Sequence, residues 1–206
     1  MPLWGATDSD ESKPKFLTDE QKKLVYATKS GWVLENGALT GNDNANADPE
    51  ILVAIGELAT SIGSADITEI EWITTTFDQS AGGLLQVRVR FNEEVDVVTT
   101  GGTPTLSVTN GNQGSGTGRG PHALAYASGT GSNELIFQLT IGAGQTVVVE
   151  DDVLVIGANV LALNSGTIKD KGTSTNSTIT NVASIGTAAG TAVSYTHLTL
   201  PTNREV

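Results

Sequence analysis

The sequence predicts an all-β protein whose largest part is an antiparallel β-sandwich. Apolar and polar residues alternate in several short segments, and a period of two turns one face of each strand towards a core. These segments are residues 85–91, 105–108, 123–126, 134–140 and 153–156. Glycine, asparagine and proline separate them at the spacing typical of sandwiches. The composition agrees, because 24 glycines and an aromatic content of 5% leave valine, isoleucine, leucine and alanine to build the core.

Charge and composition exclude several classes of function. The 206 residues carry a net charge of −12. Such a surface repels phosphate groups, so we expect no nucleic-acid partner. The absence of cysteine excludes disulfides and thiolate chemistry. No apolar run approaches the roughly 20 residues that span a bilayer, so we expect no membrane insertion. Residues 1–8 lack the basic and apolar regions of a signal peptide.

Residues 1–20 are predicted to form an extended N-terminal arm, because they are polar and have few apolar anchors. Trp4 and Phe16 are the exceptions. Either they dock on a neighbouring subunit, or they pack on the first module of their own chain.

Residues 21–65 are predicted to form a small β-rich module that follows the arm. The apolar run at its end is nearly continuous, which predicts a strand buried on both faces. The spacing of threonine and glutamine before the module is that of a helix capping box. The predicted pieces are a capped helical turn at 18–21, strands at 24–28, 31–35 and 50–56, and a loop at 38–49.

Residues 66–191 are predicted to form the sandwich, after a connector at 59–66. The first strand, 67–72, alternates in two phases. One phase buries Ile70 and Trp72, and the other buries Ile67 together with two glutamates. We prefer the first phase, because it removes a large aromatic side chain from water.

The last residues, 192–206, are predicted to be a non-native tail. Residues 193–202 read codon for codon as a translated transposase sequencing adaptor. We therefore expect the native coding to end near Thr191 and the sandwich to be truncated. The alternative is a genuine exposed tail. On the adaptor interpretation His197 is not native, and His122 is the remaining histidine.

Four motifs in the second half of the chain occur in a defined order. They are residues 87–97, 102–108, 126–137 and 163–170. Together they resemble a family of Ig-like domains in bacterial surface and phage proteins. The resemblance covers roughly residues 66–172 and implies an Ig-like sandwich, a fold that serves many functions. The glycine-rich stretch 111–120 departs from the family's pattern.

Shorter motifs near the N-terminus carry a second resemblance. They are Trp4-Gly5, Lys13-Pro14-Lys15, residues 31–33 and residues 50–56. They resemble the N-terminal module of virion structural proteins from marine T-even-like phages. The resemblance implies that this module anchors the chain to a particle and precedes variable sandwiches.

Acidic residues at the predicted strand ends are candidate metal ligands. Strand-end carboxylates sometimes hold Ca²⁺ in Ig-like domains of this kind, and Ca²⁺ takes 6–8 oxygen ligands. The candidates are Glu94, Asp151 and Asp170. The alternative is that these carboxylates are solvated and keep strand edges from aggregating. We expect no cofactor other than such a calcium ion.

The glycine-rich loop 111–120 is a candidate binding loop. It lacks the Gly-Lys-Ser/Thr ending of a phosphate-binding loop, and a strand rather than a helix follows it. We interpret it as a hairpin extension, the region of a sandwich where binding residues are found. The candidate binding residues are Asn112, Gln113, Thr117, Arg119 and His122, the last read as an ordinary surface histidine.

These expectations favour a non-enzymatic structural component of a phage virion that displays an Ig-like domain for surface attachment. The arm and module would contact other virion proteins, and the sandwich loops would contact host-surface glycans or proteins. The alternative is a bacterial cell-surface or secreted adhesin module, stiffened by calcium. A carbohydrate-active enzyme has the least support, because a glycosidase needs two carboxylates in a sugar cleft and the aromatics that line such clefts are scarce.

Overall fold

The computed structural model describes residues 13–35, 38, 44, 48–78, 81–109, 120–143, 153–183, 185 and 192–195. Strands dominate these residues. Helical structure includes the short helix α1 (Asp19–Lys23) and the 3₁₀ turn η2 (Leu58–Thr60). The prediction of an all-β protein is confirmed.

The strands fall into an N-terminal group and a larger group. The N-terminal strands are β1 (Val25–Thr28), β2 (Gly31–Leu34) and β3 (Glu50–Ala54). The larger group comprises β4 (Ile67–Trp72), β5 (Thr76–Asp78), β6 (Gly83–Val98), β7 (Thr105–Val108), β8 (His122–Ser128), β9 (Ser132–Ile141), β10 (Val153–Leu154), β11 (Leu161–Ala162), β12 (Thr167–Asp170) and β13 (Ala192–Tyr195). All five alternating segments predicted from the sequence contain strands.

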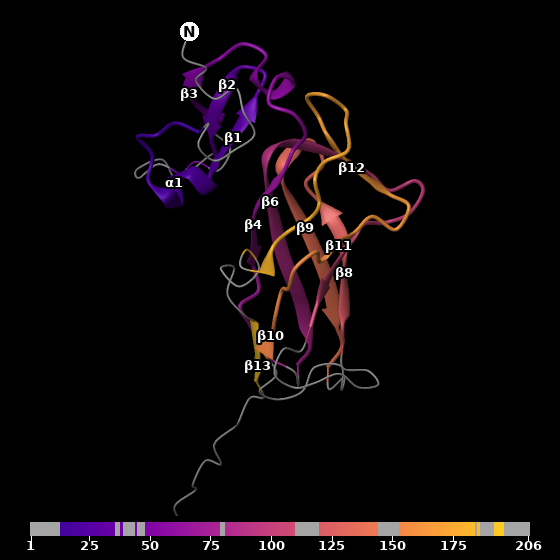
Figure 1. Cartoon of the computed structure of the whole chain (residues 1–206). Helices are drawn as coiled ribbons and strands as arrows, with labels where there is room; N and C mark the ends of the chain where they lie inside the picture. The colour runs from indigo at the N-terminus through magenta and orange to yellow at the C-terminus, as the bar shows by residue number, and fades with distance from the viewer. Residues whose placement is uncertain are drawn as a thin grey trace, which may run out of the picture.

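Strand β6 organises the topology. It is 16 residues long and pairs antiparallel with β4, β9 and β12 and parallel with β1. The main sheet has 10 strands, with the path β11-β7-β8-β9-β6-β1-β2-β3 and with β4 and β12 attached to β6. A 3-stranded sheet has the order β10-β13-β5. The N-terminal strands lie at one end of the long strands, and β10 and β13 lie at the other (Figure 1).

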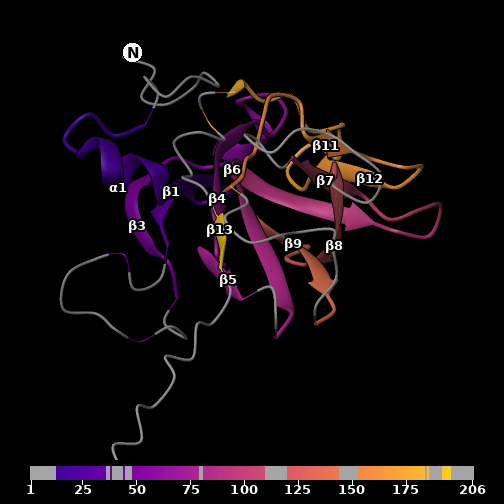
Figure 2. The same ribbon diagram turned by 90° about the horizontal axis from the view of Figure 1, so that it is seen from below.

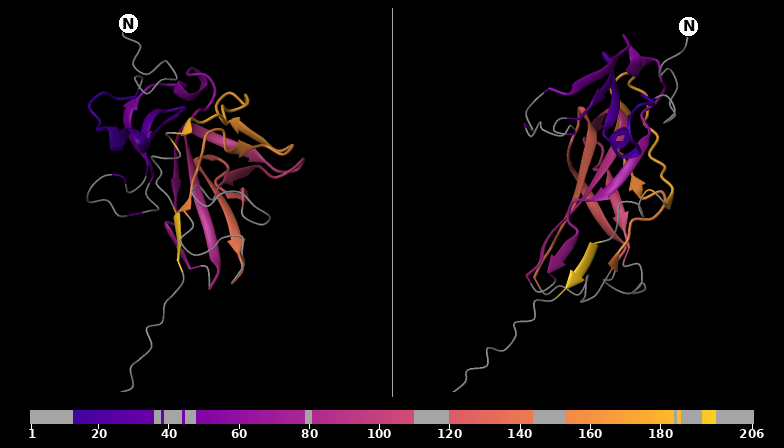
Figure 3. Two further views of the ribbon diagram at one scale, coloured as in Figure 1. Left: turned by 60° about the horizontal axis from the view of Figure 1, so that its bottom comes forward. Right: turned by 90° about the vertical axis from the view of Figure 1, so that its left-hand side faces the viewer.

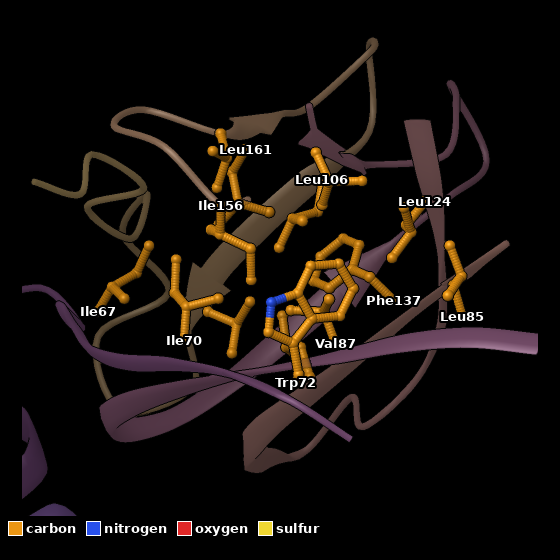
Figure 4. Close-up of a cluster of buried hydrophobic side chains, with 14 of the residues drawn as sticks. Ile67, Ile70, Trp72, Leu85, Val87, Leu106, Leu124, Phe137, Ile156 and Leu161 are labelled. Atoms are coloured by element: carbon orange, nitrogen blue, oxygen red, sulfur yellow. The ribbon is translucent and has the colours of Figure 1, made fainter. Parts of the chain in front are cut away.

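The main hydrophobic core lies inside the curved larger group. Trp72 of β4 and Phe137 of β9 point towards Leu106 of β7 and Leu161 of β11, with Ile156 between them (Figure 4). Most of the strands that surround this core belong to the 10-stranded sheet, whereas β10, which contributes Leu154, belongs to the 3-stranded sheet. The division into the two sheets of a sandwich and the Ig-like connectivity stay predictions.

Strand β4 adopts the preferred phase. Ile70 is fully buried and Trp72 is 6% exposed. Ile67 also joins the core, because the pairing register with β6 shifts between Ile67 and Glu69. This irregularity turns a residue inward that strict alternation would place on the opposite face.

The N-terminal strands have a smaller core of their own around Trp32, which is 2% exposed. The predicted capping box is present: Thr18 Oγ1 accepts from the Gln21 amide at 3.2 Å, and Gln21 Oε1 accepts from the Thr18 amide at 3.0 Å. Leu17 packs into this core, whereas Phe16 is 71% exposed. Phe16 therefore does not pack on its own module, and Trp4 lies outside the described residues. Seen from below, α1, β1 and β3 lie to one side of β7, β8 and β11 (Figure 2).

The prediction that residues 50–56 are buried on both faces is wrong. β3 is the last strand in the path, so it has one strand neighbour, β2, among the described strands. Ile51 is 54% exposed, and Ala54 is also exposed. An apolar run resembles a central strand in sequence, but its burial depends on neighbours that the run itself does not specify.

Some of the predicted tail is described. Residues 192–195 form β13, which pairs antiparallel with β10 and parallel with β5 (Figure 3). The rest of the tail and most of the predicted arm lie outside the described residues. Across the residues that the structure does describe, no helix has the length and apolar character needed to cross a membrane.

Candidate functional site

Ionised side chains gather where the N-terminal strands meet the larger group of strands. Arg88 and Arg90 lie on the outer face of β6, because alternate residues of a strand point to opposite faces. Val87, Val89 and Phe91, which alternate with them, are buried in the main core. The arginines therefore face away from the core, towards carboxylates of the neighbouring strands.

Arg90 is the centre of this network. Its side chain is 8% exposed. Nε lies 2.7 Å from Glu134 Oε1, while Nη1 lies 3.1 Å from Glu69 Oε2 and 3.0 Å from Glu71 Oε1. The strand register explains this geometry, because Arg90 is opposite Glu69 of β4 on one side and Glu134 of β9 on the other.

Arg88 forms ion pairs with two of the same carboxylates. Its Nη2 contacts Glu71, and its Nη1 lies 3.2 Å from Glu134 Oε1. Glu71 and Glu134 therefore bridge the two arginines across three adjacent strands.

Glu35, which follows β2, links the N-terminal strands to this network. Its Oε1 accepts from Asn133 Nδ2 of β9 at 2.8 Å and lies 3.5 Å from Arg90 Nε. The side chain of Glu35 is 17% exposed. One carboxylate of the N-terminal group is thus held by both β6 and β9.

Two other contacts strengthen this connection. Lys23 of α1 lies 3.4 Å from Glu69 Oε1. On the backbone, Ala27 of β1 pairs in parallel with Glu93 of β6. We call the whole assembly the junction network: Glu35, Glu69, Glu71, Glu134, Arg88, Arg90, Lys23 and Asn133.

Burial and mutual charge change the proton affinities of the junction network. Burial raises the pKa of the Glu35 carboxyl, and the adjacent Glu134 raises it further, against the opposing effects of Asn133 and Arg90. Burial opposes the charged form of Arg90, but Glu35, Glu134 and Glu71 raise its pKa above the ordinary value. Glu69 raises the pKa of Lys23.

Burial and nearby carboxylates also change the pKa of Tyr26 on β1. Its burial, together with the charges of Glu94, Glu35 and Glu134, raises the pKa of the phenol to about 12. The phenol is therefore neutral across the physiological range.

A cavity of about 420 Å³ lies where the turn after β1 approaches the end of β12. Lys29 and Ser30 line it on one side, and Glu94 and Lys171 line it on the other. Lys171 Nζ lies 2.9 Å from Glu94 Oε2 and donates to the Gly131 carbonyl at 3.1 Å.

Two of the predicted calcium ligands, Glu94 and Asp170, are described, and they point to opposite faces of the sheet. Asp170 is opposite Val95 in the β6–β12 pairing and is fully buried, as Val95 is. Glu94, next to Val95, points to the other face of the sheet and pairs with Lys171. Asp151 lies outside the described residues. Among the described residues, no group of three or more metal-binding side chains is placed to hold an ion.

Asp170 has a visible structural role. Its Oδ1 accepts from the Gly172 amide at 2.5 Å and from the Thr173 amide at 3.0 Å. It therefore caps the turn after β12, and the alternative interpretation as a solvated carboxylate is wrong for this residue. Glu93, which was not predicted as a site residue, is also fully buried.

Four candidate binding residues, Asn112, Gln113, Thr117 and Arg119, lie outside the described residues. His122 begins β8 opposite Val108 and is 7% exposed. Its interpretation as a surface histidine is wrong, because its place at the start of a paired strand leaves little of it open to water. The loop as a binding site stays a prediction.

The junction network was not predicted from the sequence. A signal was present, since Arg88 and Arg90 occupy the polar phase of β6 and Glu69 and Glu71 occupy the polar phase of β4. Alternation alone identifies such residues as outward-facing. It does not show that Lys23 and Glu35 of the N-terminal group lie against them.

Comparisons with known proteins add no family assignment. No protein-family model, no curated protein and no solved structure matches the chain.

Proposed function

We propose that the chain is a non-enzymatic structural protein of a phage particle, which anchors through its N-terminal strands and displays the larger β-structure for surface attachment. The motifs in residues 1–56 that resemble phage virion modules support this proposal. A bacterial surface adhesin is the alternative outcome of the test below.

The junction network is the observation that carries the proposal. An attachment protein must transmit force between its anchored region and its displayed region, and a flexible linker would let the two move independently. Here a largely buried arginine, Arg90, holds carboxylates from both regions. Removing one member of a buried ion pair leaves an uncompensated charge and costs about 3–5 kcal/mol, so the connection resists separation.

Purified particles provide the direct test. Mass spectrometry of density-purified phage particles that carry the gene should detect peptides from residues 13–35 and 85–98 at a level comparable with other structural proteins. A cytosolic host enzyme measured in the same fraction gives the contamination level. If peptides of this chain do not exceed that level, the virion assignment is wrong, and detection on the bacterial surface would support the adhesin instead.

The attachment role makes a separate prediction for the glycine-rich loop. In a binding assay with fluorescent full-length chain on host cells, Arg119→Ala should weaken binding about 5-fold or more, because arginines are common hot spots of recognition. Lys15→Ala removes the same charge from an exposed position near the N-terminus and is the matched control. Equal binding by both variants and the unmodified chain would contradict recognition through this loop.

A further inference from the structure

Strand β3 exposes an edge with apolar side chains. It ends the strand path of the main sheet, so its second edge has no strand neighbour among the described strands. Ile51 is 54% exposed, and Leu52 and Val53 are half-buried. Glu50 is the single charged residue of the strand.

The edges of β-sheets are usually protected against pairing with a strand of another chain. Lysines, prolines, short strands and bulges are the common devices. The other end of the path illustrates one of them, because β11 has only 2 residues. β3 has 5 residues and no lysine or proline, although its register against β2 shifts once, at Leu52. Its apolar side chains are therefore available to a partner.

We propose that β3 pairs edge to edge with β3 of a second copy of this chain, in antiparallel orientation. The charges favour this occupant and this orientation. A two-fold axis at Leu52 places Glu50 opposite Ala54 of the second copy, so the two glutamates do not meet. A parallel arrangement would place them side by side.

The charges near the two ends of β3 are also complementary. The end near Ile55 lies beside the turn after β1, since the Ile55 and Glu57 amides donate to the carbonyls of Ser30 and Lys29. Lys29 is exposed there, and Asp48 and Glu50 are exposed at the other end. Antiparallel pairing brings Lys29 of each copy towards the acidic end of the other.

The contact is small. A stable interface buries about 1,200–2,000 Å² in total, and a pair of five-residue strands falls below that range. The net charge of −12 on each copy also opposes association, though salt screens it over about 8 Å at physiological ionic strength. We therefore expect a weak dimer that forms where copies are concentrated.

Sedimentation equilibrium of the full chain tests the proposal. Between about 10 and 500 μM in 0.15 M salt, the mass should rise from the monomer value of 21.3 kDa towards twice that value. Ile51→Lys should abolish the rise. Val182→Lys is the matched control, because Val182 is 59% exposed outside β3 and should leave association unchanged. Circular dichroism verifies that each variant is folded.

Charge reversal tests the orientation. Lys29→Glu should weaken association, and the added change Glu50→Lys should restore it. A chain that stays monomeric throughout overturns the proposal, and a foreign strand would then be the occupant to seek. Undiminished dimerisation of Ile51→Lys places the contact elsewhere, and growth beyond a dimer contradicts a closed two-fold pair. None of these results bears on whether the chain is found in phage particles, so the two proposals fail separately.

Discussion

Arg90 is the residue on which the junction depends most. Its guanidinium approaches carboxylates of Glu35, Glu69, Glu71 and Glu134 within 3.5 Å, and its side chain is largely buried. Arg90→Ala leaves these carboxylates without their shared cation, so we expect a loss of about 3 kcal/mol in the free energy of unfolding, measured by urea denaturation. Arg90→Met keeps the apolar stem and should show how much of the loss is packing. A loss below about 0.5 kcal/mol for Arg90→Ala would contradict the role assigned to the network.

Glu35 should give the junction a characteristic pH dependence. Its pKa in the folded protein is raised, mainly by burial. A raised carboxyl pKa contributes stability that is fully present below the unfolded value and is lost as the pH rises through the folded value. Glu35→Gln removes this titration, so the stability of the unmodified chain relative to the variant should fall from about pH 4.5 upward.

Urea denaturation of both proteins at half-unit intervals between about pH 4.5 and 7.5 measures this difference. Glu57→Gln is a control, because that glutamate is exposed and lies outside the junction network. A relative stability that rises with pH would show that the attraction to Arg90 outweighs burial and would reverse the assignment.

Among the elements, β6 shows what the sequence could predict. Alternation identified residues 85–91 correctly, but the strand continues to Val98 through Asn92, Glu93 and Glu94. Polar residues usually indicate a turn at such a point. Here they stay in the strand because β12 and β1, distant in sequence, pair with it.

The same reasoning explains what could not be predicted. Local spacing was sufficient for the capping box at Thr18 and for the buried phase of Trp72, since both depend on residues within one element. The exposure of Ile51, the burial of His122 and the convergence of carboxylates on Arg90 each depend on which strands become neighbours. A single sequence does not contain that information in its periodicity.

The turn after β12 provides an element-scale prediction. Asp170 accepts two amide hydrogen bonds through Oδ1, and an asparagine in its place retains that acceptor. Asp170→Asn should therefore unfold near the temperature of the unmodified chain, whereas Asp170→Ala should lose about 1–3 kcal/mol in the free energy of unfolding.

A chelator should leave the melting curve of the unmodified chain unchanged. A clear fall in the melting temperature on chelation would instead indicate a specific calcium site.

At the scale of the whole molecule, the described residues form two hydrophobic cores of unequal size. The smaller one is built around Trp32 and includes Leu17 and Ile62, and the larger one spans β4 to β12. A core drawn from fewer than about 50 residues supplies little net stability by itself. We therefore expect the N-terminal strands to depend on the junction network, which would join them and the larger group of strands into a single mechanical unit.

Hydrogen exchange can measure this dependence in the full chain. With the junction intact, amides of β1 and β2 should open with free energies close to those of β6 and β9, because the two cores unfold together. Arg90→Ala should make β1 and β2 exchange faster than β6 and β9. Lys169→Ala is the control, because it removes a positive charge from β12, outside the junction network. It should leave the relative protection of these strands unchanged. Similar exchange patterns in the two variants would mean that packing, and not the ionic contact to Glu35, holds the N-terminal strands in place.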